Sequence, residues 1–296
     1  MSIRHVLHKD IDLQLWNEAI AGASNAVIYA DAWYLDISTN KQWDALILGD
    51  YEVVMPLPYN RKLFGYYQIY QPLFSQQLGV FSQKTSIDVQ PFIDTIPKKY
   101  RRIYYPLNYQ NAGSSNLTKT NLVIDLSVPY SETQARFSSS LRKRLRKSAA
   151  LTFSEFEDVN ALIQFYQTQL EAKVKLGQKA YDVAFDLFSY AMTHQCAKMY
   201  VIKDNETTLA MGLFLNKYNR LVNVFGASKS TKTNSNTMSI LLAKVMEHHS
   251  EQPVTFDFEG SEIPGVKTYF ESFGSVEQNY PVLIQDNLPK WIKLIR

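Results

Sequence analysis

The order of the periodic segments in the second half of the chain constrains the fold more than any other feature. From about residue 159, stretches in which apolar residues recur every three to four positions are interleaved with short runs rich in β-branched and aromatic residues. The predicted elements are helices 159–175 and 181–195, strands 199–203, 208–216 and 221–227, helix 236–250, strand 254–258, helix 266–273 and strand 278–284. This order predicts an α/β protein in which helices lie beside one twisted mixed sheet.

The first half of the chain is organised around a tight turn. A Gly-Asp pair at residues 49–50 separates the apolar runs 43–48 and 52–57, which predicts a β-hairpin. Pro56 and Pro58 are expected to place the end of this hairpin toward a sheet edge. The other predicted elements of this half are helices 13–20, 33–37 and 86–95 and strands 103–105 and 121–126. The first half is therefore also mixed α/β.

A chain of 296 residues fits two domains of about 150 residues each. Pro129 disfavours continuation of the preceding strand, and residues 131–134 read as a capping box that opens a helix. We therefore predict two lobes, 1–129 and 130–296. Segments 46–63 and 200–221 both read as strand, acidic turn and strand with Met-x-Leu, which favours an internal duplication.

Composition excludes several classes of protein. The chain is 46% hydrophobic and 20% charged, so it has apolar surface to bury and is not disordered in composition. No apolar run is long enough to cross a membrane, and charges interrupt the start of the chain, where a secretory signal would need an apolar core. Cys196 is the single cysteine, which rules out an internal disulfide and favours the cytoplasm. The histidines lack the spacing of a metal site, so no metal is expected.

Positive charge is concentrated in one segment, 133–149, which we predict to be a single helix. The apolar positions of this helix are Phe137, Leu141, Leu145 and Ala149, and its cations are Arg136, Arg142, Lys143, Arg144, Arg146 and Lys147. Arginine binds phosphate well, so Arg142 and Arg146 are candidate ligands for the phosphates of CoA, a nucleotide-linked acceptor or tRNA. The alternative is a solvated basic face.

Several segments of the second half, taken in order, resemble the FemAB-like members of the GNAT (acyl-CoA N-acyltransferase) superfamily. They are the basic segment 141–147, the strand pair TTLAMGLFLNKYN and RLVNVFGAS, the helix SILLAKVMEHH, the strand FDFEGS and the closing YFESFG. The first half is matched more loosely, through its hairpin and the segment QPLFSQQLGVF. The resemblance implies two tandem GNAT-like lobes, each a twisted mixed sheet flanked by helices, with an acyl or aminoacyl donor and an amine acceptor.

The resemblance implies two possible donors, aminoacyl-tRNA and acyl-CoA. For each donor, this chain departs from the motif that the family usually carries. Some FemAB-like proteins move amino acids from aminoacyl-tRNA onto peptidoglycan precursors, and others are thought to use acyl-CoA. Residues 228–237 contain no glycine where ordinary GNAT enzymes carry a glycine-rich pyrophosphate loop. Tyr269 is followed by Phe270 and Glu271, where tRNA-dependent members often carry a lysine. We favour acyl-CoA or acetyl-CoA as the donor and keep tRNA as the alternative.

In the GNAT arrangement the donor lies at the end of the strand predicted at 221–227, beside the next helix. Main-chain donors there polarise the donor carbonyl, and exposed N–H groups at a helix start favour an anion. The resemblance therefore implies a donor site lined by Phe225, Gly226, Ala227, Asn236 and Thr237. The alternative for the two polar side chains is an ordinary helix cap next to a flexible loop.

Three residues near the end of the chain are candidates for the chemistry. Asp257 and Glu259 face the same side of one strand, where a carboxylate can accept the proton that an attacking amine releases. Glu259 is the preferred base, although paired carboxylates at a strand end also cap turns or meet lysines. Tyr269 is expected to hydrogen-bond the leaving group, as a tyrosine does in many GNAT enzymes, and packing is its alternative role.

The acceptor is the least constrained partner. Tyr70, Gln71 and Gln77 lie in an aromatic, amide-rich stretch that suits a sugar or peptide in a cleft between the lobes, and edge-strand packing explains the aromatics equally well. The sequence thus predicts transfer of an acyl or aminoacyl group to a small-molecule or nucleotide-linked amine. The alternatives are a tRNA-dependent transferase of the peptidoglycan type and a non-catalytic ligand-binding protein on a GNAT scaffold. The oligomeric state is not predicted.

Overall fold

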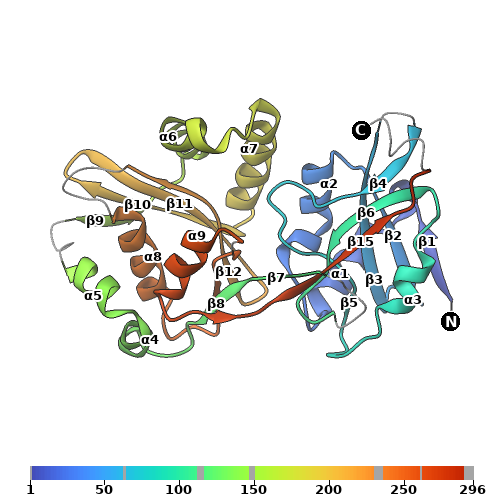
Figure 1. Ribbon diagram of the computed structural model, residues 1–296, viewed down its shortest axis with the longest axis horizontal. Helices are drawn as coiled ribbons and strands as arrows, with labels where there is room; N and C mark the ends of the chain where they lie inside the picture. The colour runs from blue at the N-terminus through green and yellow to red at the C-terminus, as the bar shows by residue number, and fades with distance from the viewer. Residues whose placement is uncertain are drawn as a thin grey trace. The chain divides into compact units, whose positions relative to one another are not determined.

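The computed structural model describes residues 2–62, 65–111, 117–146, 151–229, 236–260 and 262–289. The chain divides into two compact units, each with a mixed sheet flanked by helices (Figure 1). Unit 1 consists of Met1–Lys119 with Asn279–Arg296, and unit 2 consists of Thr120–Gln278.

Unit 1 contains one sheet with the strand order β1-β2-β3-β4-β6-β15-β7, and β5 pairs with β3 beside this path. Its elements are β1 (Ile3–Val6), α1 (Leu13–Gly22), α2 (Ala32–Thr39), β2 (Trp43–Leu48), β3 (Val53–Arg61), β4 (Tyr67–Ile69), β5 (Phe81–Ser82), α3 (Gln90–Thr95), β6 (Tyr100–Pro106), β7 (Leu117–Lys119) and β15 (Tyr280–Asp286), with 3-10 turns η1 (His8–Asp10) and η2 (Ile28–Ala30). The hairpin predicted at residues 49–50 is confirmed as β2–β3.

The prediction that the prolines place this hairpin at a sheet edge was wrong, because β3 lies inside the sheet. Beyond β2, the partners of β3 are short: β5 pairs with Val53 and Val54, and β4 pairs with residues 59–61. Pro56 and Pro58 fall between these two partners. A proline has no N–H to donate, and this position requires none from it.

Unit 2 has the strand order β14-β8-β13-β12-β11-β10-β9. Its elements are β8 (Leu122–Asp125), α4 (Tyr130–Arg136), α5 (Ser139–Leu145), β9 (Thr152–Glu155), α6 (Val159–Val174), α7 (Gln178–Thr193), β10 (Ala197–Asp204), β11 (Thr207–Lys217), β12 (Arg220–Ser228), α8 (Thr237–His248), β13 (Thr255–Asp257), α9 (Pro264–Glu271) and β14 (Val276–Glu277). Helices α6 and α7 cover one face of the sheet, and α8 and α9 lie on the other (Figure 1).

The two sheets share one plan. When they are read as β1-β2-β3-β4-β6-β15-β7 and β9-β10-β11-β12-β13-β8-β14, all neighbours are antiparallel except the fourth and fifth strands, β4/β6 and β12/β13. The similar hairpins β2–β3 and β10–β11 occupy matching positions, which confirms the predicted duplication. The sixth strand of each sheet is out of chain order. In unit 1 it is β15, which follows all of unit 2, and in unit 2 it is β8, which precedes β9.

The units therefore divide at 119/120 and 278/279, whereas the sequence predicted a single division at 129/130. The predicted boundary falls in the turn between β8 and α4, inside unit 2. Strand β8 is bound to unit 2 through its pairing with β13 and β14. The final strand, expected in the second lobe, pairs instead with β6 and β7 of unit 1. Strand pairing of this kind leaves no trace in apolar periodicity.

The helix predicted at 133–149 is broken into α4 and α5. Ser138 interrupts it, because its Oγ accepts from the N–H of Leu141 at 3.2 Å and its own N–H donates to the carbonyl of Ser272 at 2.8 Å. Phe137 and Leu141 are buried as predicted. The predicted capping box does not form, since Pro129 occupies the N-cap position of α4 and contributes no side-chain bond. Ala149 and Lys147 lie outside the described residues.

Within the described ranges, no helix is both long enough and apolar enough to cross a membrane.

Candidate functional site

Strands β12 and β13 part after three residues. They pair in parallel only through residues 220–222 and 255–257. Beyond this, the N–H of Phe258 donates to the carbonyl of Leu122 at 3.0 Å, so the chain follows β8 and leaves β12. Beyond Val222, β12 continues to Ser228, and in the described residues its strand partner there is β11. Within the described part of unit 2, residues 223–228 therefore present an edge with no strand partner, where main-chain N–H and C=O groups can meet a ligand.

A β-bulge lies where the two strands part. Phe225 is paired with Leu213 and Asn223 with Phe214, so Val224 is an extra residue on β12. A bulge bends its strand and re-aims the neighbouring main-chain groups, and bulges are common beside active sites. The side chains of Asn223 and Val224 are half-buried, while those of the paired residues before them are buried.

The three predicted donor-site residues on β12 have different roles in packing. The ring of Phe225 is buried and stacks on Tyr166 of α6, with ring centroids 4.0 Å apart, so this side chain is used in packing. Ala227 is also buried. A Cβ on Gly226 would lie 3.1 Å from the carbonyl oxygen of Met211 and 3.4 Å from Cε of Met238. The tight contact is with the main chain of β11, and Met238, in the first turn of α8, lies at ordinary contact distance from this edge.

The start of α8 lies beside this edge. Asn236 occupies its N-cap position, but the Asn236 side chain makes no capping bond. Thr237 is buried, and its hydroxyl donates to the carbonyl of Leu209 at 3.1 Å, so this predicted ligand side chain is used within the fold. A hydrogen bond joins α8 to α9: Oγ of Ser239 donates to the hydroxyl oxygen of Tyr269 at 3.2 Å. Residues 230–235, within the predicted loop, lie outside the described residues.

Tyr269 is held in its protonated form. Burial raises the pKa of Tyr269 to about 12, against smaller lowering effects from the hydrogen bond with Ser239 and the positive charge of Arg144. Burial disfavours the charged phenolate, so the neutral phenol predominates at every pH below about 12. At neutral pH the hydroxyl is therefore a hydrogen-bond donor and not a base.

Arg144, on α5, is the cation whose charge acts on Tyr269. Its Nε is buried and has no hydrogen-bond partner among the described residues. The two arginines singled out from the sequence differ from it: Arg142 donates to the carbonyl of Ala135 at 2.7 Å, and Arg146 is exposed at the end of α5. A signal for Arg144 was present, because it lies three residues after the buried Leu141 and so on the same side of a helix.

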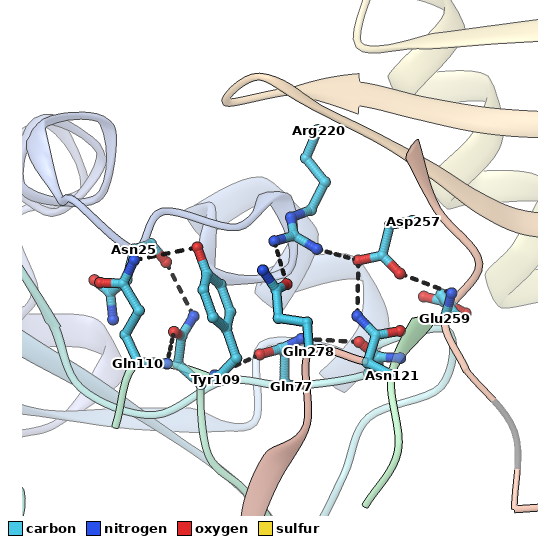
Figure 2. Close-up of polar contacts among 11 residues, drawn as sticks. Asn25, Gln77, Tyr109, Gln110, Asn121, Arg220, Asp257, Glu259 and Gln278 are labelled. Atoms are coloured by element: carbon cyan, nitrogen blue, oxygen red, sulfur yellow. Dashed lines mark hydrogen bonds and ion pairs between the residues drawn. The ribbon is translucent and has the colours of Figure 1, made fainter. Parts of the chain in front are cut away.

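Asp257 lies in a buried polar network, shown in Figure 2. One carboxylate oxygen of Asp257 forms an ion pair with Arg220 and accepts from Asn121 at 3.2 Å, and the other accepts from the main-chain N–H of Glu259 at 2.7 Å. Arg220 also donates to Gln278 at 2.6 Å. Both oxygens of Asp257 are thus occupied by protein donors in a buried position. The network ties β12, β13 and the segment before β8 together at the point where the strands part.

Glu259 follows in an unusual backbone conformation. Its φ is +59° and that of Gly260 is +56°, so two successive residues are left-handed. This conformation is uncommon for a residue with a side chain. A Cβ on Gly260 would lie 2.1 Å from the carbonyl oxygen of Thr120, so only glycine fits there. The Glu259 side chain is half-buried at this turn.

The matching position in unit 1 is closed by its own chain. Where β6 extends past β4, Leu78 donates its N–H to the carbonyl of Pro106 at 2.9 Å and forms a parallel bridge with Leu107. This segment pairs with the chain beyond the end of the β4/β6 pairing, whereas in unit 2 no described strand pairs with β12 beyond the end of the β12/β13 pairing, on the side away from β11. The candidate site therefore belongs to unit 2.

The predicted acceptor residues lie in unit 1 and are mostly engaged there. Gln71 donates to the carbonyls of Ser75 and Gln76 at 2.7 and 3.0 Å. Gln77 is buried and accepts from the N–H of Tyr109 at 2.8 Å. Tyr70 is half-buried, and burial raises its pKa. These contacts stabilise the loop within unit 1. No group of three metal-ligating side chains is found in the part of the chain that the structure describes.

Comparison with known proteins agrees with this architecture. No protein-family model matches the sequence, and no curated protein is significantly similar to it. Among solved structures, FemX is similar over 100% of both chains, with a TM-score of 0.72 and 12% identity. The C-terminal domain described as that of a lysylphosphatidylglycerol synthetase from Agrobacterium fabrum has a TM-score of 0.58 and 10% identity, over 96% of this chain and 94% of the other. L-PGS from Bacillus licheniformis has a TM-score of 0.51 and 13% identity, over 96% and 95%.

These likenesses establish the fold of the chain. It has a FemX-like fold with two units, each a mixed sheet flanked by helices, as the sequence predicted.

Proposed function

We propose that unit 2 transfers an acyl or aminoacyl group from an activated donor to an amine, with acyl-CoA as the favoured donor. The observation that carries this proposal is the open edge of β12 at residues 223–228, bulged at Val224 and adjoining the first turn of α8 and Tyr269. Main-chain donors held in this way stabilise the negative charge that develops on the donor carbonyl as an amine adds to it.

The donor is a phosphate-bearing molecule under either form of this proposal. The N–H groups at the start of α8 favour an anion, and Arg144 adds a guanidinium whose Nε has no partner among the described residues. A phosphate oxygen is the acceptor that arginine binds most effectively. Arg144 and the α8 terminus together are therefore the proposed phosphate-binding groups, with Arg142 and Arg146 as outer cations.

In the proposed reaction the amine nitrogen forms a bond to the donor carbonyl carbon, and the bond from that carbon to the leaving sulfur or oxygen breaks. Glu259 is the proposed acceptor for the proton that the amine loses. Tyr269 donates a hydrogen bond to the leaving atom. Its pKa of about 12 lies above that of a thiol, roughly 8.5, so full proton transfer to a thiolate is unfavourable and hydrogen bonding is its role.

Replacement of Tyr269 tests the site directly. Tyr269→Phe keeps the ring and removes the hydroxyl, so kcat is expected to fall about 100-fold while donor binding changes little. The rate is measured as release of free thiol from acyl-CoA in the presence of an amine. Tyr190→Phe, on α7, is the matched control and is expected to leave kcat unchanged. A Tyr269→Phe variant as fast as the wild type would contradict the proposed role.

Replacement of Arg144 tests the phosphate site. Arg144→Gln is expected to weaken donor binding by about tenfold or more, because a charge-assisted hydrogen bond is lost. Lys143→Gln removes an equal charge from an exposed position on the same helix and is expected to weaken binding less than about threefold. Binding is measured by calorimetry. Equal losses in the two variants would indicate a diffuse basic surface and no specific site.

Aminoacyl-tRNA is the second candidate donor, favoured by the cations on α4 and α5. A calorimetric screen of acetyl-CoA, longer acyl-CoAs and charged tRNA separates the two donors. Binding of tRNA would fall steeply with added salt, with a slope set by the number of phosphates contacted. Tight donor binding without any transfer would identify a non-catalytic binding protein, and Glu259→Gln would then leave every measured property unchanged.

A further inference from the structure

A hollow of about 420 Å³ lies between α6 and α7 in unit 2. Its size is within the range of small-molecule sites. The polar side chains along it are Asn160, Gln164 and Gln167 from α6 and Gln178, Asp182 and Asp186 from α7. Ile163 and Tyr181 also line it and are buried, so they form an apolar floor. Phe185 lines it as well and is 39% exposed, which is unusual for a phenylalanine.

The helices that form this hollow are firmly held. The Tyr181 hydroxyl donates to the carboxylate of Glu171, which links α7 to α6. The ring of Tyr166 on α6 contacts Tyr181 and also stacks on Phe225, beside the bulge of β12. The hollow is thus built on the helix that packs directly against the proposed reaction site.

The charged side chains that line the hollow are both negative. Asp182 and Asp186 are four residues apart on α7 and so lie one above the other on the same helix face, where like charges repel. Asp182 accepts from Nε2 of Gln178 at 2.8 Å. No lysine or arginine of the described residues forms an ion pair with either carboxylate, and none lines the hollow. A bound cation would remove this repulsion.

We propose that this hollow binds a molecule that carries a protonated amine, with the ammonium between Asp182 and Asp186 and the rest of the molecule along Ile163, Phe185 and the glutamines of α6. The amides offer both donors and acceptors to a polar chain, whereas an anionic ligand finds no counter-charge. The inference rests on the proposed function, because an amine is the acceptor class of that reaction. The hollow would bind a second, protonated amino group of the acceptor, away from the acceptor nitrogen that is acylated.

The test is a calorimetric titration of the full-length protein, without donor, using the diamine 1,5-diaminopentane and the neutral diol 1,5-pentanediol as probes. The wild type is expected to bind the diamine and not the diol. Asp182→Asn with Asp186→Asn is expected to weaken diamine binding by about tenfold or more, since charged hydrogen bonds are lost. Glu157→Gln with Glu206→Gln, two exposed carboxylates elsewhere in unit 2, makes the same change in net charge and is expected to bind as the wild type does.

The Asp182→Asn, Asp186→Asn variant keeps the shape of both side chains and relieves a repulsion, and its thermal unfolding serves as the folding check. Diamine binding that is absent in the wild type, equal in the two double variants, or matched by the diol would overturn the proposal. Donor binding measured separately in the same variant is expected to be unchanged. If the variant loses diamine binding but still binds the donor, the result tests the hollow alone. If the wild type binds no donor, the proposed function fails, whatever the result for the hollow.

Discussion

A fragment of residues 120–278 is expected to fold on its own, whereas a fragment of residues 130–296, cut at the boundary that the sequence suggests, is expected to remain unfolded. The first contains all seven strands of the sheet of unit 2. The second lacks β8, which lies between β13 and β14 and buries Leu122, Val123 and Ile124. Three such side chains contribute roughly 5–9 kcal/mol, which is comparable to the whole stability of a domain.

Thermal unfolding followed by circular dichroism distinguishes the two fragments. The 120–278 fragment is expected to show one cooperative transition, and the 130–296 fragment none. The longer fragment also carries the β15 segment without its partners β6 and β7, so it has an unpaired strand that favours aggregation. Cooperative unfolding of the 130–296 fragment would mean that β8 is dispensable and would contradict the assignment of β8 to unit 2 and of β15 to unit 1.

Arg220→Met is expected to destabilise the protein by about 3–5 kcal/mol, since it leaves the carboxylate of Asp257 buried without its counter-ion. For a domain of this size the Tm of unit 2 would fall by on the order of 10 °C. Methionine keeps most of the side-chain volume, so the loss reports charge and hydrogen bonding more than packing. Denaturant unfolding measures the change in the free energy of unfolding.

Two further variants make this result specific to the network in Figure 2. Asp257→Asn removes the charge and keeps an oxygen for the N–H of Glu259, so Arg220→Met with Asp257→Asn is expected to cost less than the sum of the two single changes. Lys198→Met breaks the exposed ion pair with Glu155, 2.9 Å long, and is expected to change stability by less than about 1 kcal/mol. If Arg220→Met were as mild as Lys198→Met, the buried network would not be what holds this turn.

The longer helices and strands of unit 2 were predictable because their apolar residues recur with the period of the element. The amphipathic pattern at 159–175 became α6 (Val159–Val174), and the run at 221–227 became β12 (Arg220–Ser228). The duplication was also visible, through two hairpins with the same turn chemistry. Family resemblance added the tandem arrangement that FemX shares.

The candidate site was only partly predictable. The sequence pointed to Gly226 and Tyr269, which the structure brings to the first turn of α8. It also pointed to Thr237, whose hydroxyl is used within the fold, and it passed over Arg144 in favour of its neighbours. The direction in which each cation of α5 points depends on the break at Ser138, and that break depends partly on a tertiary hydrogen bond to Ser272.

The amino-acid pattern alone specified the element types, the buried faces and the doubled hairpin, since these follow from the spacing of apolar residues and the chemistry of turns. Only the folded chain revealed that β8 belongs to unit 2 and β15 to unit 1, and that β12 and β13 separate after Val222. The reason is physical. Strands pair through main-chain hydrogen bonds that nearly every residue can make. The partner of a strand is therefore determined by the tertiary packing of the other elements and not by its own side chains.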